Sequence, residues 1–495
     1  MKQIHFTTET ELNSILDASD AAYKIFSRLN VDIRASFLEE IAAQMLLIQT
    51  AITETASQET NLPLQRIESE FIRTIHQLKS YAANCRLGLW MDVRIDTKDS
   101  EPGTTLNDLR KTYLGLGTVA VFGASNFPLA YSTAGGDTAC AFAAGCAVIV
   151  KAHSAHLQTG LLVSEAIEKA VDLFGLPKGL YAQVIGKGNE IGEQLVMHPK
   201  VKAVGFTGSY SGGMALHRLA MNRKEPIPVF AEMGSVNPVY LFEGFLSKHT
   251  DLVAGWYADS ITASMGQFCT NPGILVGIKS TWLDLLIEKL SAKIDKVSPQ
   301  LMLHQGIADA FRTKRNALIN TNGVRLMTTD IETDHSLKAI PSLASVDAKL
   351  FIENRALHEE VFGPLSLVVV CENYEEMTLV ANIIEGQLTA TIIADEDELS
   401  QHPAIEEAIK DKCGRLIFNG VPTGVQVSFA QNHGGPFPAT TDSRFSAVGA
   451  DGIKRFSRPV TYQNYPEALL PPELQNSNPL KIMRTVNNKM TRDSI

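Results

Sequence analysis

Hydrophobic and polar positions follow two different periods along this chain. In its first part, apolar side chains recur every three to four positions, which predicts amphipathic helices over residues 11–29, 34–52 and 68–88. A polar stretch containing Pro and Gly, residues 94–117, comes next and is typical of a β-ribbon or a linker. The chain therefore opens with a helical region that this stretch separates from the remaining residues.

From residue 118 onward, short apolar segments alternate with helical ones. The expected order is strand then helix throughout: strands 118–123, 146–152, 180–186 and 201–209, and helices 132–145, 156–175 and 188–198. Such alternation predicts βαβ units and a parallel, doubly wound sheet. Sheets of this kind bind ligands at the carboxyl ends of their strands.

The alternation returns after Glu232 and predicts a second α/β domain. Its expected strands are 237–242, 273–278, 365–370, 388–393 and 415–420, with one helix reaching residue 264 and another over 281–294. The tail beyond Arg458, rich in Pro and Asn, has little periodicity and predicts an extended arm.

Length and charge narrow the class of protein. A chain of 495 residues is too long for one simple core, so two or three domains are expected. The net charge of −10, without a long run of one sign, argues against nucleic acid and anionic membranes as partners. The N-terminus lacks the apolar run of a signal peptide, and a long uncharged stretch, residues 112–136, is interrupted by glycines, Asn126 and Pro128. We therefore expect a cytoplasmic protein with no membrane partner.

The six cysteines are scattered and include no Cys-x-x-Cys pair. This spacing predicts neither a disulfide framework nor a metal site. Each cysteine is then expected to be a reduced thiol, and a small buried hydrophobe is the ordinary role of such a residue.

Three polar side chains follow apolar strands. Asn126 lies in a turn beside Pro128, where its amide either donates into a cleft or bonds its own backbone. Lys151 ends a wholly apolar strand, so its charge faces either a ligand or water past the sheet edge. Glu232 follows another apolar strand and is either a general base or a turn cap.

Two further segments are candidates for chemistry. Gly208 and Ser209 join a strand to a helix, which suits a phosphate or is simply a tight turn. Cys269 lies between a helix and a Pro-Gly turn, so its thiol is either inert or accessible near helix-end dipoles. No histidine is close to it in sequence, so a Cys-His pair cannot be read locally.

An ordered set of motifs resembles the aldehyde dehydrogenase superfamily over nearly the whole chain. The motifs are SNFPLA, KAHS, GFTGS, EMG, GQFC and EEVFGP. Three longer stretches, FGASNFPLAYSTAGGDTA, PTGVQV and HGGPFPATT, resemble the NADP-preferring branch that includes 2,5-dioxopentanoate (α-ketoglutaric semialdehyde) dehydrogenases. Two common family stretches differ here, since Glu-Leu-Gly-Gly-Lys reads Glu-Met-Gly-Ser-Val-Asn-Pro from Glu232, and Pro-Trp-Asn reads Ala-Ser-Asn up to Asn126. Both differences match the branch.

The resemblance implies catalytic roles for three residues. Cys269 would form a thiohemiacetal with the aldehyde, Asn126 would donate to its oxyanion, and Glu232 would activate the water that hydrolyses the resulting thioester. Retention of Cys269 and Glu232 argues against a non-catalytic relative, and Glu232 argues against acyl transfer to coenzyme A.

The resemblance also implies a nicotinamide cofactor. Lys151 would contact the adenosine ribose and Ser209 the pyrophosphate, next to Gly208, while Glu360 and Phe362 would hold the nicotinamide ribose and ring. Ser154 stands where NAD-preferring members often carry glutamate, so we expect NADP to be preferred, with NAD as a second option.

The resemblance implies a small-molecule aldehyde as the substrate. The main hypothesis is oxidation of α-ketoglutaric semialdehyde to 2-oxoglutarate, and the alternative is a medium- or long-chain fatty aldehyde. A dicarboxylic semialdehyde needs a cation that binds its distal carboxylate. The candidate substrate contacts are Arg444, His433 and Phe127. His433 is either near the thiol or a turn residue, and Arg444 is either a ligand or a surface residue.

The fold that the resemblance implies is α/β, with a Rossmann-like cofactor domain, a catalytic domain and a small β oligomerisation element. The expected limits are 1–93 and 115–233 for the cofactor domain, 234–430 for the catalytic domain, 431–458 for a return to the cofactor domain, and 94–114 with 459–495 for oligomerisation. We expect a homodimer or homotetramer.

Overall fold

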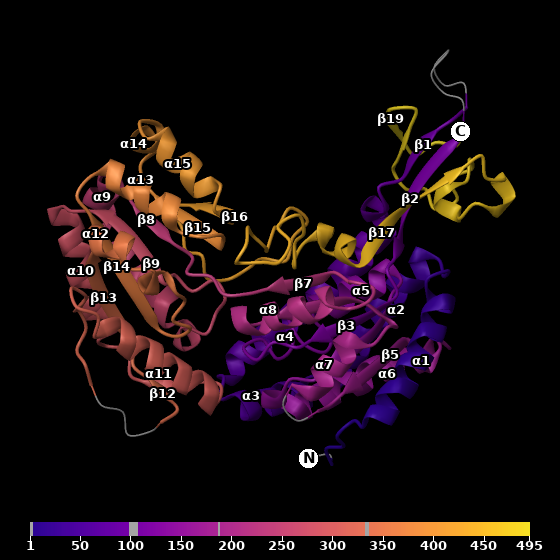
Figure 1. Cartoon of the computed structure of the whole chain (residues 1–495), viewed down its shortest axis with the longest axis horizontal. Coiled ribbons are helices and arrows are strands. Elements are labelled where there is room, and N and C mark those ends of the chain that lie inside the picture. Colours follow the sequence, from indigo (N-terminus) through magenta and orange to yellow (C-terminus); the bar gives the residue numbers. More distant parts are fainter. Residues whose placement is uncertain (1–2, 99–106, 187–188, 332–335) are drawn as a thin grey trace.

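The computed structural model describes residues 3–98, 107–186, 189–331 and 336–495. Two sheet-centred units lie side by side, and a third, smaller sheet projects from one of them (Figure 1). The predicted class, two doubly wound α/β domains with a small β element, is confirmed. The residue limits of the domains stay a prediction.

The first sheet has five parallel strands in the order β5-β4-β3-β6-β7. Their bounds are β3 (Thr118–Phe122), β4 (Ala147–Lys151), β5 (Tyr181–Val184), β6 (Val201–Thr207) and β7 (Val229–Glu232). The chain adds strands outward from β3 to β5, then returns to place β6 on the other side of β3. The carboxyl ends of β3 and β6 therefore flank a topological switch point, where such sheets form a ligand crevice.

Both faces of this sheet are buried, because alternate residues of one strand enter different cores. Val119 and Val121 pack into a core that also takes in α5 (Gly136–Ala144) and α6 (Leu157–Leu173). Ala120, between them, packs on the opposite face with side chains from α7 (Glu190–Met197) and α8 (Tyr210–Met221). Period-2 alternation explains why these strands read as continuous apolar runs.

Four helices precede the sheet: α1 (Glu9–Phe26), α2 (Val31–Leu47), α3 (Gln49–Thr60) and α4 (Leu64–Leu87). The expected single helix over 34–52 is wrong, because Ile48 (φ −121°, ψ 25°) leaves the helical region and separates α2 from α3. No Gly or Pro marks this break, so the local pattern could not show it. The predicted helix 188–198 corresponds to α7, and residues 187–188 lie outside the described part.

The second sheet has seven strands in the order β11-β13-β14-β9-β8-β15-β16, parallel except for the edge strand β11. The strands are β8 (Val239–Leu241), β9 (Ile274–Ile278), β11 (Arg325–Leu326), β13 (Ser342–Asp347), β14 (Leu365–Cys371), β15 (Gln387–Ile393) and β16 (Cys413–Phe418). Helices α9 (Glu243–Thr262), α10 (Thr281–Ile294), α11 (Gln305–Ile319), α12 (Ala348–Glu353), α13 (Tyr374–Ile383), α14 (Glu396–Ser400) and α15 (Pro403–Lys410) belong to this unit. The β13 strand, Ser-Leu-Ala-Ser-Val-Asp, has too few large apolar residues for sequence reasoning to mark it.

The third sheet joins segments from opposite ends of the chain, in the order β17-β2-β1-β18-β19. Its strands are β1 (Arg94–Asp96), β2 (Leu109–Gly115), β17 (Ser457–Gln463), β18 (Arg484–Val486) and β19 (Lys489–Thr491). The predicted ribbon supplies β1 and β2, and its residues 99–106 lie outside the described part. The tail is not a single extended arm, because it contributes three strands to this sheet.

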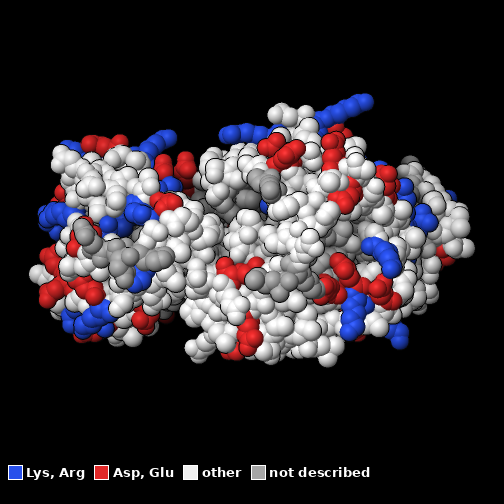
Figure 2. Space-filling view, turned by 90° about the horizontal axis from the view of Figure 1, so that it is seen from below, with Lys and Arg blue, Asp and Glu red and all other residues white. Residues whose placement is uncertain are grey.

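The charge on one face of the molecule and the apolarity of the described helices bear on possible nucleic-acid and membrane contacts. On the face drawn in Figure 2, basic and acidic side chains are interspersed rather than gathered in one large patch, apart from what the grey atoms cover. Among the described residues, no helix combines the length and apolarity that crossing a bilayer requires.

A buried ion pair holds the segment after the second sheet against the first. Arg455, near the end of the 3-10 helix η6 (Ala450–Phe456), places Nη2 2.7 Å from Oδ1 of Asp137 in the first turn of α5. The two side chains are only 5% and 11% exposed, so little water screens their attraction. Arg455 Nε also donates to the Gly452 carbonyl at 3.2 Å.

We predict that Arg455→Met lowers the free energy of unfolding by about 3–5 kcal/mol, because it leaves the Asp137 carboxylate buried without a partner. Urea unfolding followed by tryptophan fluorescence measures this. The control is Arg444→Met, whose pair with Asp442 involves a 78% exposed guanidinium and should change stability by at most about 1 kcal/mol. Equal effects of the two substitutions would contradict the prediction.

Candidate active site

Three side chains from distant parts of the chain meet between the two large sheets. Glu232 is the last residue of β7, Cys269 follows the 3-10 helix η4 (Ala263–Gly266), and His433 lies in the loop between β16 and η6. His433 Nε2 is 3.0 Å from Glu232 Oε1 and 3.7 Å from Cys269 Sγ. One imidazole nitrogen therefore touches both the candidate base and the candidate nucleophile.

Backbone contacts set the positions of Glu232 and His433. Glu232 pairs with Thr440 in an isolated antiparallel bridge, so the returning loop lies directly against the end of β7. His433 receives further restraint from Ser446 Oγ, which accepts from its N–H at 2.9 Å, and from the Ala447 N–H, which donates to its carbonyl at 2.7 Å. Both side chains are nearly inaccessible, 3% exposed for Glu232 and 1% for His433.

Asn237 holds the loop that carries Cys269. Its Nδ2 donates to the carbonyls of Cys269 and Asn271 at 2.8 and 2.9 Å, and its Oδ1 accepts from Thr389 Oγ1 at 2.9 Å. Asn237 is fully buried and has a positive φ of 46°, a conformation that asparagine tolerates better than most residues. Sequence reasoning missed this residue, and its one local signal was a polar residue before Pro238.

The environment holds the Cys269 thiol protonated. Burial raises its pKa well above the ordinary value, and the carboxylates of Glu232 and Glu360 add to the shift, while the Arg73 guanidinium opposes it. At rest the site therefore carries a thiol and not a standing thiolate. Glu232 Oε2 is buried and has no hydrogen-bond partner among the described residues, so it has the capacity to accept a proton.

Asn126 lies in the turn after β3 and faces the cysteine loop. Its Nδ2 donates to the Gln267 carbonyl at 3.2 Å, two residues before Cys269. Its own carbonyl accepts from Arg66 Nη2 at 2.8 Å, which ties the turn to α4. The structure thus brings Asn126, Glu232 and Cys269 to one region, as sequence reasoning expected of them.

A cavity of about 280 Å³ opens beside the thiol. Its walls are mainly aromatic and cationic side chains around Cys269: Arg66, Arg73, Phe127, Tyr131 and Phe268. The guanidinium of Arg66 lies 4.8 and 5.2 Å from the ring centroids of Phe127 and Phe268. Phe127, a predicted substrate contact, therefore lines this cavity.

The two cavity arginines come from one face of α4. Arg66 is paired with Glu70 at 3.1 Å, and Glu70 also accepts from the backbone N–H groups of Leu129 and Ala130. Arg73 donates to Tyr131 Oη at 3.2 Å, to Gln77 Oε1 at 3.3 Å and to the Val425 carbonyl at 3.4 Å, and no carboxylate in the described part of the chain forms an ion pair with it. The cavity thus holds a guanidinium whose charge has no ion-pair partner among the described residues.

Arg444, the arginine predicted from sequence to bind substrate, is placed elsewhere. Its side chain is 78% exposed and pairs with Asp442 at 2.6 Å, and it is not among the residues that line the cavity at Cys269. Sequence reasoning missed Arg66 and Arg73 because they lie on a helix about two hundred residues before the thiol, with no motif around them.

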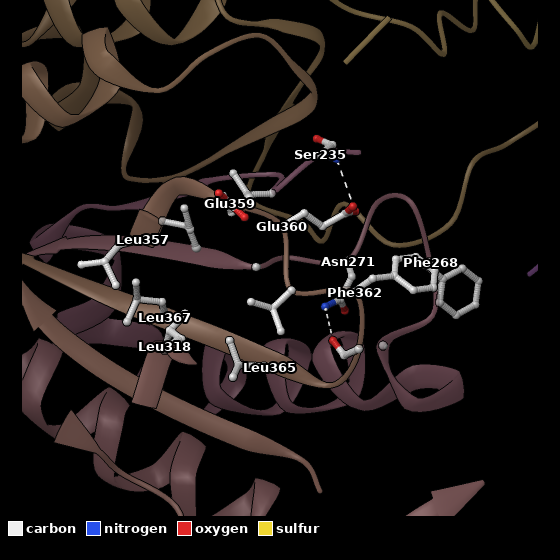
Figure 3. Close-up of a pocket in the computed structure, with 16 residues that line it drawn as sticks. Ser235, Phe268, Asn271, Leu318, Leu357, Glu359, Glu360, Phe362, Leu365 and Leu367 are labelled. Atoms are coloured by element: carbon white, nitrogen blue, oxygen red, sulfur yellow. Dashed lines mark hydrogen bonds between the residues drawn. The ribbon is translucent and has the colours of Figure 1, made fainter. Parts of the chain in front are cut away.

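A second, smaller pocket adjoins the first (Figure 3). Glu360, from the loop before β14, accepts from the Ser235 N–H at 3.3 Å, and burial raises its pKa to about 7. Phe362 lies in the same loop, which Asn271 Nδ2 holds by donating to the Gly363 carbonyl at 3.2 Å. Phe268 lines both pockets, so the two adjoin at the cysteine loop.

The remaining predicted cofactor residues lie at the carboxyl edge of the first sheet. Lys151 ends β4, Gly208 follows β6, and Ser209 caps α8 by accepting from the Gly212 N–H at 3.2 Å. Lys151 is partly buried, and no ion pair is formed by it within the described ranges. Ser154 is exposed in the 3-10 helix η2 (Ser154–His156).

These features fit a dinucleotide. A helix N-terminus without acidic residues in its first turn suits phosphate, and a partly buried lysine suits a ribose or phosphate oxygen. A partly buried carboxylate such as Glu360 suits the hydroxyls of a ribose. Lys151, Gly208 and Ser209 lie at the carboxyl edge of the first sheet, and Glu360 lies in the loop before β14 of the second.

The sequence model of the Aldehyde dehydrogenase family matches residues 1–336. The chain is 46% identical over 459 residues to alpha-ketoglutaric semialdehyde dehydrogenase 2 of Azospirillum brasilense, covering 92% of this chain and 87% of the relative. It is 44% identical over 494 residues to alpha-ketoglutaric semialdehyde dehydrogenase of Acinetobacter baylyi, covering 98% and 93%.

Solved structures agree on the fold. Aldehyde dehydrogenase 21 from Physcomitrella patens, in complex with the product succinate, has a TM-score of 0.79 at 19% identity and covers 92% of this chain and 91% of that one. The glyceraldehyde-3-phosphate dehydrogenase GapN from Methanocaldococcus jannaschii, in complex with NADP, also has a TM-score of 0.79 at 19% identity, with coverage of 94% and 96%. The chain belongs to the aldehyde dehydrogenase family, and it oxidises an aldehyde to the acid with NAD or NADP as cofactor.

Proposed function

We propose that this enzyme oxidises α-ketoglutaric semialdehyde (2,5-dioxopentanoate) to 2-oxoglutarate, with NADP as the preferred cofactor. The observation that carries the substrate proposal is the Arg73 guanidinium in the wall of the cavity at Cys269, which forms no ion pair with any described carboxylate and donates three hydrogen bonds to neutral groups. Two relatives that cover nearly the whole chain bear this substrate in their names.

Arg73 and Arg66 match the two ends of that substrate's polar tail. The semialdehyde carries a carboxylate and a neighbouring ketone at the end opposite its aldehyde, and a guanidinium binds such paired oxygens through two parallel N–H groups. Phe127 and Phe268 would contact the methylene groups between the two ends. A fatty aldehyde, the alternative expected from sequence, has no group for either arginine.

Glu232 and His433 prepare the nucleophile. With its proton on Nε2, His433 donates to Glu232 Oε1, which leaves Oε2 free to take the thiol proton. The Cys269 sulfur then attacks the aldehyde carbon. His433 acts through Glu232 here and is a positioning residue.

Asn126 stabilises the oxygen that becomes negative during attack. Its Nδ2, now on the Gln267 carbonyl, would turn to the substrate oxygen together with the Cys269 backbone N–H. One such donor contributes about 3–4 kcal/mol to lowering the barrier.

Bound NADP would supply the hydride acceptor that converts the thiohemiacetal into a thioester. Lys151, Ser154, Gly208 and Ser209 would hold its adenosine and phosphate parts, and Glu360 and Phe362 its nicotinamide part. Glu232 would then take a proton from the water that hydrolyses the thioester, which releases the acid and restores the thiol.

The third sheet is the part that we assign to self-association. It projects from the first domain (Figure 1), and well-exposed apolar side chains lie in its strand β19, Met490 at 72%, and in the connection between β17 and β18, Leu469 at 66%. Its edge strand β19 leaves backbone groups free to pair with another chain. A homodimer or homotetramer built on this sheet would cover these groups.

The nucleophile and base are tested together. We predict that Cys269→Ala abolishes NADPH formation, whereas Glu232→Gln gives at most one equivalent of NADPH per site and then stalls, because the thioester is not hydrolysed. Stopped-flow absorbance of NADPH separates the two outcomes. Steady turnover of either variant at the parent rate would remove that residue from its role.

The substrate assignment is tested at Arg73. We predict that Arg73→Met lowers kcat/KM for the semialdehyde about 10- to 150-fold, the loss of a hydrogen bond to a charged group, and changes kcat/KM for hexanal little. Arg444→Met, which removes an exposed guanidinium paired with Asp442, is the matched control and should alter neither value. An equal loss for both aldehydes in Arg73→Met would show that Arg73 serves structure and not specificity.

The cofactor preference is tested at Ser154. We predict that Ser154→Glu lowers kcat/KM for NADP at least about tenfold relative to NAD, because a carboxylate repels the 2′-phosphate and accepts from ribose hydroxyls. Parallel kinetics with the two cofactors measure the ratio. A parent enzyme that already prefers NAD would overturn the NADP assignment.

A further inference from the structure

Cys269, Glu232 and His433 offer three different metal-binding atoms at one point. One sulfur, one carboxylate oxygen and one imidazole nitrogen all lie within 4.8 Å of one another. Thiolate, imidazole and carboxylate are the ligand types that zinc binds, and three protein ligands with one open position is a common zinc arrangement. Local spacing gave no hint of this, because the three residues are far apart in sequence.

Two of the three ligand separations are close to those of a tetrahedral zinc site. Zinc bonds of about 2.3 Å to sulfur and about 2.0–2.2 Å to nitrogen and oxygen place neighbouring ligand atoms about 3.3–3.6 Å apart. The Cys269 Sγ–His433 Nε2 distance is 3.7 Å, and the His433 Nε2–Glu232 Oε1 distance is 3.0 Å. The third separation, between Cys269 Sγ and the Glu232 carboxylate, is at most 4.8 Å, so side-chain adjustments of up to about 1.5 Å would seat the ion.

The surroundings supply the charge balance and the open position. A Cys269 thiolate and the Glu232 carboxylate together neutralise a divalent cation, and His433 adds a neutral donor. Glu232 Oε2 is buried without a hydrogen-bond partner among the described residues, so the carboxylate has unused coordinating capacity. The cavity at Cys269 leaves room for a water as the fourth ligand.

We propose that this enzyme binds one Zn²⁺ ion reversibly at Cys269, Glu232 and His433, and that the bound ion blocks catalysis. On binding, the Cys269 S–H bond breaks, its proton leaves to solvent, and a sulfur–zinc bond forms; the Nε2 proton of His433 moves to solvent while Nδ1 is protonated. Zinc then occupies the sulfur lone pair that would attack the aldehyde and the carboxylate that would accept the proton. Only the inhibitory half of this inference rests on the proposed function.

Binding is tested with the metal alone on the full-length, cofactor-free enzyme. Titration with Co²⁺ should produce one equivalent of a near-ultraviolet thiolate-to-cobalt charge-transfer band, with the visible bands of a tetrahedral site, and Zn²⁺ should displace it. Glu232→Gln and His433→Asn should each weaken Co²⁺ binding at least about tenfold. Cys413→Ser, which removes another partly buried free thiol, is the control and should bind like the parent.

Inhibition is tested with the semialdehyde and NADP. Zn²⁺ should inhibit the parent and Cys413→Ser with an inhibition constant equal to the binding constant, and chelation by EDTA should restore the rate. The binding half is overturned if equimolar Co²⁺ gives no thiolate band, or if Glu232→Gln and His433→Asn bind it like Cys413→Ser. The inhibitory half is overturned if stoichiometric zinc leaves turnover unchanged. A zinc-binding enzyme that does not oxidise the semialdehyde would refute the proposed function and leave the metal site standing.

Discussion

The buried carboxylate of Glu232 is the constraint on which the rest of the site depends. An ionised group that is 3% exposed is costly unless it is hydrogen-bonded, and the partner here is His433, some two hundred residues later in the chain. That contact requires the loop after the second sheet to return to the end of β7. There, Thr440 of the loop forms an isolated antiparallel bridge with Glu232. The Arg455–Asp137 pair anchors the same segment further on. The contacts that position Glu232 and His433 therefore also hold the loop after the second sheet against the first sheet.

The same carboxylate explains how the thiol proposed as the nucleophile is held protonated at rest. Burial and the negative charges of Glu232 and Glu360 raise the pKa of Cys269, so the sulfur is protonated at rest. Release of the proton needs an acceptor that is already in place, and Glu232 Oε2 is unpartnered beside it among the described residues. Any cation that stabilises the thiolate shifts this balance, whether it is part of a bound cofactor or the proposed zinc ion. Control of the thiol is therefore electrostatic and local.

Specificity is arranged separately from the reaction. Arg66 and Arg73 belong to α4, which contributes nothing to the sheet edges where the reacting groups lie. Glu70 pairs with Arg66 and accepts from two backbone amides, whereas Arg73 donates only to neutral groups and forms no ion pair with a described carboxylate. Substitutions on α4 can therefore change which aldehyde the cavity binds, while the reacting residues stay unchanged.

The sequence by itself determined the α/β class, the order of most strands, and the region of Cys269, Glu232 and Asn126. Strands that are buried on both faces need apolar residues at successive positions, so they can be recognised in the sequence as apolar runs. Groups at the carboxyl ends of parallel strands lie at the same edge of the sheet. It could not show the break at Ile48, the strand β13, or the three strands of the tail, because none has a local period. Tertiary structure alone decided that His433 meets the thiol, that Asn237 holds its loop, and that Arg66 and Arg73 rather than Arg444 face it. These are contacts between residues far apart in sequence. Only the packing of the two domains sets the distances at which these residues can interact.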